Sequence, residues 1–240
     1  MSEQKNVLVI CQTAAGQMYL GVLLKRIWYK SILAKTVEEG IHYAGENPFS
    51  LIVFDTDMPD RDRDQAISLL RSEPSVKDIP LVVFLTSEKG KSSESLLARG
   101  CSAVITKPLD MSLVYSILAR LSGQERQVPR VPTRIRVEIE EKTPEKYLTC
   151  INISEGGMYL RTIDALPEKG TLRLKFILPR DTAEIQTTSE VIRTESLGTR
   201  IETEPGMALR FVDISEENRS RIRNFVQWEL TGDLDWKATI

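Results

Sequence analysis

Short apolar runs that alternate with helix-patterned stretches most constrain the fold of the first half of the chain. The runs lie at residues 7–10, 51–54, 81–85 and 103–106, with a less apolar one at 31–36. An uninterrupted apolar run of this length indicates a parallel strand that is covered on both faces. After the first run, four apolar residues recur at i, i+3, i+4 and i+7, which predicts one face of a helix: Leu20, Leu23, Leu24 and Ile27. Further helices are expected at 37–45, 64–72, 91–99 and 110–121. Five such β–α units predict a doubly wound, five-stranded parallel α/β sheet over residues 1–122.

The pattern changes after residues 123–132, a segment with two prolines that is predicted to be a linker. Three apolar residues then alternate with charged ones, as in a half-buried strand: Ile135, Val137 and Ile139. Further short strands, separated by turn residues, are expected at 147–153, 158–162, 171–178, 185–194 and 207–212. Six strands of this kind predict a closed antiparallel β-barrel within residues 133–240.

A helix is expected to follow the last strand of this barrel. Ser215 offers an N-cap, and the two glutamates after it are favourable at the positive end of a helix. Three residues give the helix an apolar face that packs on the barrel: Ile222, Phe225 and Val226. Trp228 and Trp236 are predicted to be packing residues. The fold class is therefore α/β plus β.

Composition limits the function classes. With 41% hydrophobic residues over 240 positions, the chain can bury two ordinary domains. Lys+Arg 32 against Asp+Glu 34 gives a net charge of -2, so nucleic acid is not an expected partner. We find no signal-peptide pattern and no apolar run of membrane-spanning length, so we expect a cytoplasmic protein without membrane insertion. The cysteines are expected to be buried thiols: Cys11, Cys101 and Cys150.

Two polar motifs stand on either side of the first strand of the second half. The first is a pair of arginines four residues apart, Arg126 and Arg130. The second, about twenty residues later, is a polar turn with three residues of interest: Asn152, Ser154 and Gly157. This order and spacing resemble the two-part signature of PilZ domains, bacterial receptors for the dinucleotide cyclic di-GMP, over roughly residues 124–228. The resemblance implies that these five residues bind cyclic di-GMP.

The chemistry of the two motifs suits such a ligand. An arginine fork can donate to O6 and N7 of guanine, stack on a purine, or hold a phosphate with two hydrogen bonds. Asn152 and Ser154 supply short polar groups for the guanine N–H edge, and Gly157 lets the backbone approach the ligand. Taken singly, the arginines are more typical of solvated linker charges, and the polar turn is more typical of an ordinary connection. Their combination in this order favours the binding site.

Three residues at strand ends give the first half a second resemblance. Asp55 follows the third predicted strand, Thr86 closes the fourth, and Lys107 follows the fifth. The segments around them resemble the receiver domain of two-component response regulators. In that family Asp55 would be the phospho-acceptor, Thr86 would hydrogen-bond the phosphoryl group, and Lys107 would neutralise its charge. The alternative for Lys107 is an ion pair with Asp55.

The sequence departs from the receiver pattern at the metal site. Receivers place two acidic residues after the first strand to hold Mg²⁺, and here the matching residues are Cys11 and Gln12. A thiol and an amide are poor ligands for this hard cation, so bound Mg²⁺ is not expected. The aromatic residue of the family's fifth strand is also missing, because Val104 stands three residues before Lys107. We therefore expect a pseudo-receiver that works without phosphorylation, as a dimerisation or protein-docking module.

Three functional hypotheses follow. The first is a cyclic di-GMP effector whose receiver-like half mediates assembly. The second is a response regulator driven by phosphorylation at Asp55, with a PilZ-like output domain that binds no nucleotide. The third, an RNA-binding barrel, is disfavoured by the acidic balance of charge. An enzyme is not expected, because the single histidine, His42, has no catalytic or metal-ligand pattern around it.

Overall fold

The computed structural model describes residues 4–57, 60–86, 93–124, 128–140, 145–196, 204–232 and 234 of the 240-residue chain. It divides into two compact units. The first comprises Met1–Gln127 with Thr231–Ile240, and the second comprises Val128–Leu230. Each unit is described below by itself.

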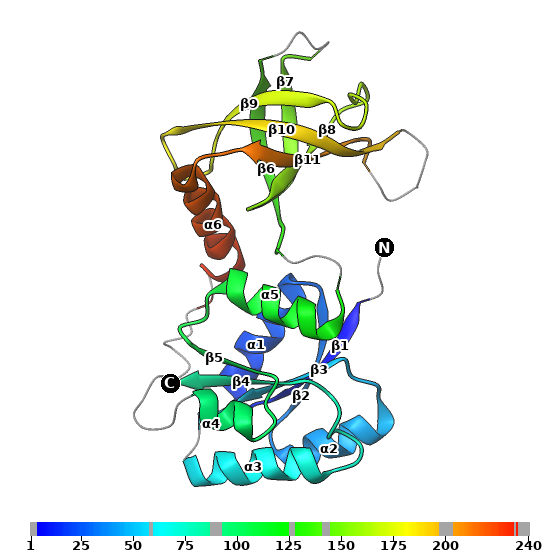
Figure 1. The fold of residues 1–240 in the computed structure, drawn as a ribbon, viewed down its shortest axis with the longest axis vertical. Coiled ribbons are helices and arrows are strands. Elements are labelled where there is room, and N and C mark those ends of the chain that lie inside the picture. Colours follow the sequence, from blue (N-terminus) through cyan, green and yellow to red (C-terminus); the bar gives the residue numbers. More distant parts are fainter. Residues whose placement is uncertain are drawn as a thin grey trace. The chain divides into compact units, whose positions relative to one another are not determined.

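The first unit is a five-stranded parallel sheet with helices between its strands (Figure 1). Its strands are β1 (Lys5–Ile10), β2 (Tyr29–Ala34), β3 (Leu51–Asp55), β4 (Leu81–Thr86) and β5 (Ala103–Lys107). Its helices are α1 (Ala14–Arg26), α2 (Val37–Glu46), α3 (Asp60–Ser72), α4 (Ser93–Ala98) and α5 (Met111–Ser122). The strand order β2-β1-β3-β4-β5 is that of the flavodoxin-like doubly wound folds.

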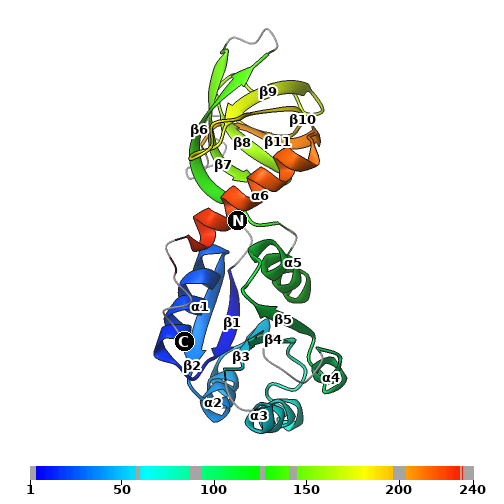
Figure 2. The ribbon, with the colours of Figure 1, turned by 90° about the vertical axis from the view of Figure 1, so that its left-hand side faces the viewer.

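Helices cover both faces of this sheet. Figure 2 shows α1 and α5 on one face and α2, α3 and α4 on the other. The central strand β3 is buried along its whole length, which explains the unbroken apolar run in its sequence. Side chains from α2, α3 and α4 complete one core with it, among them Val37, Ile67 and Leu96.

Side-chain caps define where the helices begin. The Thr13 hydroxyl accepts from the amide N–H of Gly16, and the Thr36 hydroxyl accepts from that of Glu39. At α5, the Asp110 carboxylate accepts from two amides of the first turn. Each cap satisfies donors that have no partner inside the helix, so it fixes the point at which the chain turns away from a strand end.

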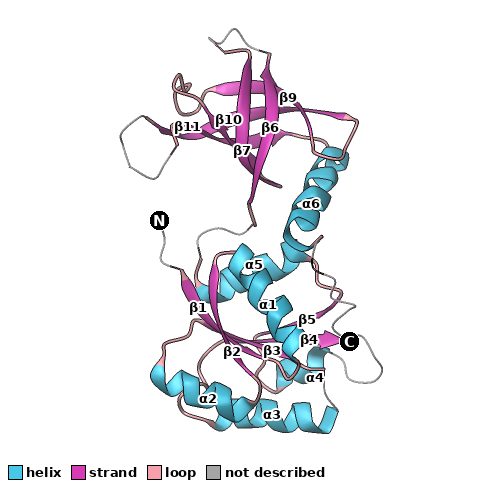
Figure 3. Ribbon diagram, turned by 180° about the vertical axis from the view of Figure 1, so that it is seen from behind, coloured by secondary structure: helices cyan, strands magenta, loops and turns pink. Residues whose placement is uncertain are grey.

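The second unit is a closed six-stranded antiparallel barrel with one helix (Figure 3). Its strands are β6 (Val131–Ile139), β7 (Tyr147–Ser154), β8 (Gly157–Arg161), β9 (Thr171–Ile177), β10 (Glu184–Glu195) and β11 (Gly206–Asp213). Around the barrel they follow the order β10-β11-β8-β7-β6-β9. Closure leaves no unpaired strand edge, and the inward residues, such as Val137, Leu160 and Val191, form the core.

Helix α6 (Glu216–Thr231) follows β11. Ser215 caps it, since its hydroxyl accepts from the amide of Asn218. Ile222, Phe225 and Val226 are buried, as the sequence pattern predicts. Trp228 remains 43% exposed, and its ring is covered on one side by the Arg180 guanidinium. Trp236 lies outside the described residues.

The expected fold class is confirmed, and several element boundaries differ from the expected ones by a few residues. Helix α3 begins at Asp60 rather than at 64, and β2 begins at Tyr29 rather than at 31. Strand β6 begins at Val131, inside the segment that we expected to be a linker. Pro132 does not prevent this, because a proline is tolerated near the start of a strand. The pairing of Val131 with Ile153 of β7 extends the barrel into the motif region.

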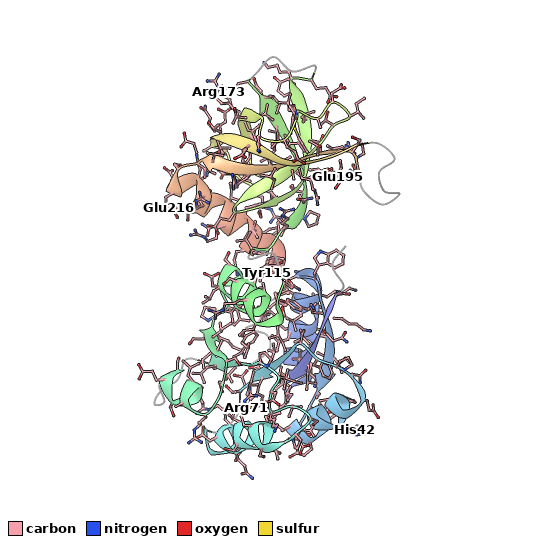
Figure 4. All side chains as sticks on the ribbon, turned by 45° about the vertical axis from the view of Figure 1, so that its right-hand side comes forward. His42, Arg71, Tyr115, Arg173, Glu195 and Glu216 are labelled. Atoms are coloured by element: carbon pink, nitrogen blue, oxygen red, sulfur yellow. The ribbon has the colours of Figure 1, made fainter. Side chains whose placement is uncertain are left out.

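Other expectations about single residues were also tested. Cys11, Cys101 and Cys150 are buried free thiols, as expected. His42 lies exposed on α2, with Nε2 3.7 Å from Oε1 of Glu46 (Figure 4). In the described part of the chain, every helix is too short or too polar to cross a membrane.

A glycine at the start of β8 allows two strands to meet, which gives the first prediction. A Cβ on Gly157 would lie 2.0 Å from the carbonyl oxygen of Leu209 in β11, whereas one on Gly156 would meet nothing within 4 Å. We expect Gly157→Ala to lower the free energy of unfolding by about 1–3 kcal/mol, because a backbone atom must move. Urea unfolding followed by circular dichroism measures this. Gly156→Ala is the matched control, and equal stability of the two variants would contradict the prediction.

Candidate functional site

The two predicted motif pieces come together where β6 begins and β7 ends. Pro132 pairs with Asn152 and Val131 pairs with Ile153, so the residues that follow Arg130 run beside the residues that precede Ser154. The two pieces are about twenty residues apart in sequence, and antiparallel pairing alone makes them neighbours. The sequence predicts both pieces, whereas their pairing register comes only from the structure.

Register shifts occur in the same part of β7 on both of its sides. Between Cys150 and Asn152, β7 has one residue more than its partner β8. On the other side of β7, its partner β6 has one residue more between Pro132 and Ile135. An extra residue in one strand bends it and redirects its side chains, and such bulges are frequent beside binding sites. The bulges place Asn152 opposite Pro132 on one side and opposite Tyr159 on the other.

Asn152 has an acceptor to spare. Its side-chain Oδ1 is buried and has no hydrogen-bond partner among the residues that the structure describes. A buried amide oxygen without a partner is unfavourable, by about 1–3 kcal/mol. The backbone carbonyl of Asn152, in contrast, accepts from the thiol of Cys150 at 3.2 Å. Burial raises the pKa of Cys150 to about 12, so this thiol stays neutral.

Ser154 and Gly157 form the turn between β7 and β8. The Ser154 hydroxyl donates to the carbonyl oxygen of Gly157 at 3.1 Å, and only 2% of Ser154 is exposed. Its oxygen keeps the capacity to accept, but the described contact of the hydroxyl lies within the turn. Gly157 allows a close approach to the backbone of β11. Strand packing therefore explains this glycine, which the sequence analysis connects with the ligand.

The arginine motif is described only in part. Arg130 is half-buried directly before β6, next to the buried Pro129. Arg126 lies outside the described residues. The geometry therefore brings together Arg130, Asn152 and the Ser154–Gly157 turn, and the part of Arg126 in the site stays a prediction.

One ion pair at this turn was missed by the sequence reasoning. Glu155, inside the motif, pairs with Arg223 of α6 through two contacts, from Nε to Oε2 at 3.0 Å and from Nη2 to Oε1 at 2.7 Å. Neither Glu155 nor Arg223 is singled out by a pattern in the sequence. A separation of 68 residues leaves no local pattern that could have connected them.

The second candidate site lies at the carboxyl ends of β3, β4 and β5. Nζ of Lys107 is 2.7 Å from Oδ1 of Asp55 and 2.9 Å from Oδ2 of Asp57. The Thr86 hydroxyl donates to the other oxygen of Asp57. The structure therefore brings the three predicted residues Asp55, Thr86 and Lys107 together. It adds Asp57, a carboxylate that already holds both the hydroxyl and the ammonium.

Electrostatics distinguish the two carboxylates. Burial raises the pKa of Asp55, and the hydrogen bond and charge of Lys107 offset this only in part. Burial also acts to raise the pKa of Asp57, but hydrogen bonds from Thr86 and Lys107 outweigh it and leave the pKa below its ordinary value. The charges of both carboxylates raise the pKa of Lys107 despite its burial, so the ammonium remains protonated.

The side of this crevice formed by β1 carries no carboxylate. The Cys11 thiol donates to Oδ2 of Asp55 at 3.6 Å, and burial raises its pKa, with the charge of Asp55 adding to the effect. A neutral thiol and the Lys107 ammonium thus contact the carboxylate that a cation would need. This donor set does not fit Mg²⁺, which prefers several oxygen ligands.

A comparison with known domain families identifies the second half. The family model described as "PilZ domain" matches residues 124–228. These residues form a PilZ domain. The match spans the barrel and most of α6, including every residue of the motif geometry described above.

Comparisons of the whole chain add relatives that each cover about half of it. The chain is 25% identical over 115 residues to "Signal transduction histidine-protein kinase BarA" of Shigella flexneri. The aligned region covers 48% of this chain and 12% of the kinase. A solved signal receiver domain of a histidine kinase from Syntrophus aciditrophicus is similar with 22% identity and a TM-score of 0.44, over 51% of this chain and 93% of that one. The Bacillus subtilis inhibitor of motility MotI/DgrA is similar with 23% identity and a TM-score of 0.41, over 47% of this chain and 54% of that one.

The chain thus spans about an eighth of the kinase and about half of the motility inhibitor. The PilZ domain at residues 124–228 is a regulatory domain type.

The Lys107 ion pairs lead to the second prediction. The side chains of Asp55 and Lys107 are 3% and 8% exposed, so Lys107→Met leaves a buried carboxylate without its cation. We expect a loss of about 3–5 kcal/mol in unfolding free energy at pH 7. Without Lys107 the raised pKa of Asp55 rises further, so the folded state binds the proton more tightly than the unfolded state. The stability of Lys107→Met therefore falls as pH rises. Its deficit in unfolding free energy relative to wild type should shrink as the pH is lowered from 7 to 5.

Urea unfolding of wild type and variant at several pH values checks this prediction. Asp55→Asn combined with Lys107→Met is the control, because it removes the titrating group. We expect the deficit of the double variant to be smaller and independent of pH in this range. A single variant as stable as wild type at pH 7 would show that Lys107 is not needed to neutralise the crevice.

Proposed function

We propose that this protein is a cyclic di-GMP effector, in which the PilZ domain binds the dinucleotide and the receiver-like unit mediates dimerisation or docking of a protein partner. The pairing of Pro132 with Asn152 is the observation that carries the ligand assignment. It makes a half-buried arginine and an amide with an unused acceptor neighbours on one end of the barrel. A ligand with two guanines and two phosphates offers donors to the amide and acceptors to the arginine.

The roles in this site follow from the chemistry of each group. Arg130, with Arg126, donates to guanine or phosphate oxygens. Asn152 accepts from a guanine N–H, which would remove the cost of its unpartnered oxygen. Ser154 and Gly157 hold the turn in the shape that presents Asn152 and the backbone.

In this proposal the receiver-like unit works without phosphorylation. Asp55 contacts Lys107 and Cys11, and the groups that would hold a phosphoryl group, Thr86 and Lys107, already contact Asp57. A phosphorylated Asp55 would carry about two negative charges in place of one beside Asp57, with no metal ligands from β1 to compensate. The unit therefore keeps the scaffold through which it assembles, and the protein acts where such dinucleotides are made, in the cytoplasm.

The ligand assignment gives the third prediction. Each charge-assisted hydrogen bond from Arg130 is worth roughly 1.5–3 kcal/mol. Arg130→Ala should therefore weaken cyclic di-GMP binding by about 10- to 100-fold, since each 1.4 kcal/mol is about tenfold. Arg130→Lys should not restore affinity, because a point charge cannot reproduce the planar fork. Isothermal titration calorimetry of the full chain measures the affinity.

Arg173→Ala is the matched control. Arg173 lies on β9 beside Glu140, at the other end of β6 from Arg130 (Figure 4). Its replacement by alanine should therefore leave the affinity unchanged. Unchanged melting temperatures of the variants without ligand exclude unfolding as the cause. The ligand assignment is wrong if the wild-type protein gives no heat with cyclic di-GMP, or if Arg130→Ala binds as tightly as wild type.

The fourth prediction concerns the receiver-like unit. Incubation with acetyl phosphate and Mg²⁺ should leave the intact mass of the protein unchanged, because Asp55 lacks metal ligands and faces Lys107. Intact-mass spectrometry under conditions that preserve acyl phosphates measures this, with Asp55→Asn as the control. A gain of one phosphoryl group in wild type but not in Asp55→Asn would favour a response regulator driven by phosphorylation.

A further inference from the structure

We infer that the Glu155–Arg223 ion pair couples ligand binding at the barrel to helix α6, so that α6 is the element that reports the ligand. This inference rests on the proposed function and adds the regulation of the same site. Glu155 stands between Ser154 and Gly157, in the turn that closes the candidate ligand site. Arg223 stands near the middle of α6, so the pair joins the two directly.

The Glu155–Arg223 ion pair has a defined two-point geometry. Nε and Nη2 of Arg223 donate to the two different carboxylate oxygens of Glu155, at 3.0 and 2.7 Å. Such two-point pairing fixes the relative orientation of the two planar groups as well as their distance. The Glu155 side chain is 20% exposed and that of Arg223 is 36% exposed, so water screens the pair only in part.

Two other polar contacts of α6 lie on another part of the barrel. Arg221 pairs with Asp181 at 2.7 Å, and the Arg180 guanidinium lies 3.1 Å from the centroid of the Trp228 ring. Both Arg180 and Asp181 belong to the connection between β9 and β10. In the described part of the chain, the Glu155–Arg223 pair thus joins α6 to the predicted ligand motif.

This arrangement predicts how the ligand acts on the helix. A ligand that accepts from Arg130 and donates to Asn152 must settle against the turn that carries Glu155, and it brings two negative phosphates with it. Any shift of the turn moves the Glu155 carboxylate, and the two-point pair transmits that shift to Arg223. The buried stripe of α6, which includes Ile222 and Val226, is apolar and itself adds no directional contact that opposes the shift.

Trp228 provides the reporter for the test. With Trp28→Phe and Trp236→Phe as background, it is the one remaining tryptophan of the three in the chain. In this background, saturating cyclic di-GMP should change the emission of Trp228, because α6 shifts relative to Arg180. Arg223→Gln and Glu155→Gln should each weaken binding by about tenfold and abolish the emission change at saturation, and the double variant should be no weaker than either single variant.

Arg221→Gln is the matched control, since it breaks an ion pair of the same helix that does not contact the motif. It should keep wild-type affinity within about twofold and keep the emission change. The inference is wrong if Trp228 does not respond in a protein that binds the ligand, if Arg223→Gln keeps the response, or if Arg221→Gln loses it equally. A wild-type protein that shows no binding in calorimetry overturns the proposed function itself, and the coupling with it.

Discussion

Pairing of β6 with both of its neighbours is the constraint on which the second unit depends. β6 closes the barrel because it pairs with β7 on one side and with β9 on the other. The same pairing extends β6 to Val131, directly after Arg130, and pairs Pro132 with Asn152. Barrel closure therefore also brings together the residues of the candidate site, so a change that loosens the start of β6 affects both.

Much of the fold follows from periodicity in the sequence. Continuous apolar runs predict the buried parallel strands, and alternation predicts the barrel, because burial on two faces and on one face demand different patterns. The start of β6 could not be predicted, because Pro129 and Pro132 are typical of a linker and only the pairing with β7 makes Val131 a strand residue. The bulge at Ile151 escaped notice for the same reason, since a bulge is defined by the partner strand.

The candidate sites were predictable in their residue types and not in their contacts. Spacing after the strands identifies Asp55, Thr86 and Lys107, since the carboxyl ends of parallel strands meet at one edge. Spacing does not reveal that Asp57 holds both Thr86 and Lys107, because that depends on side-chain orientation. Likewise, Glu155 and Arg223 are ordinary surface residues in sequence, and only the packing of α6 on the barrel makes them partners.

The two candidate sites differ in how their buried polar atoms are satisfied, and this argues for a division of labour. In the crevice of the first unit, the chain supplies its own cation, since Lys107 contacts both carboxylates and Thr86 contacts one. A ligand there would have to displace internal partners in a site of low dielectric, where separating charges is costly. At the barrel, Asn152 keeps a buried acceptor without a partner in the described structure, so a ligand with an N–H donor gains a hydrogen bond and displaces nothing. This difference supports the proposal that the barrel responds to a ligand and that the crevice is structural.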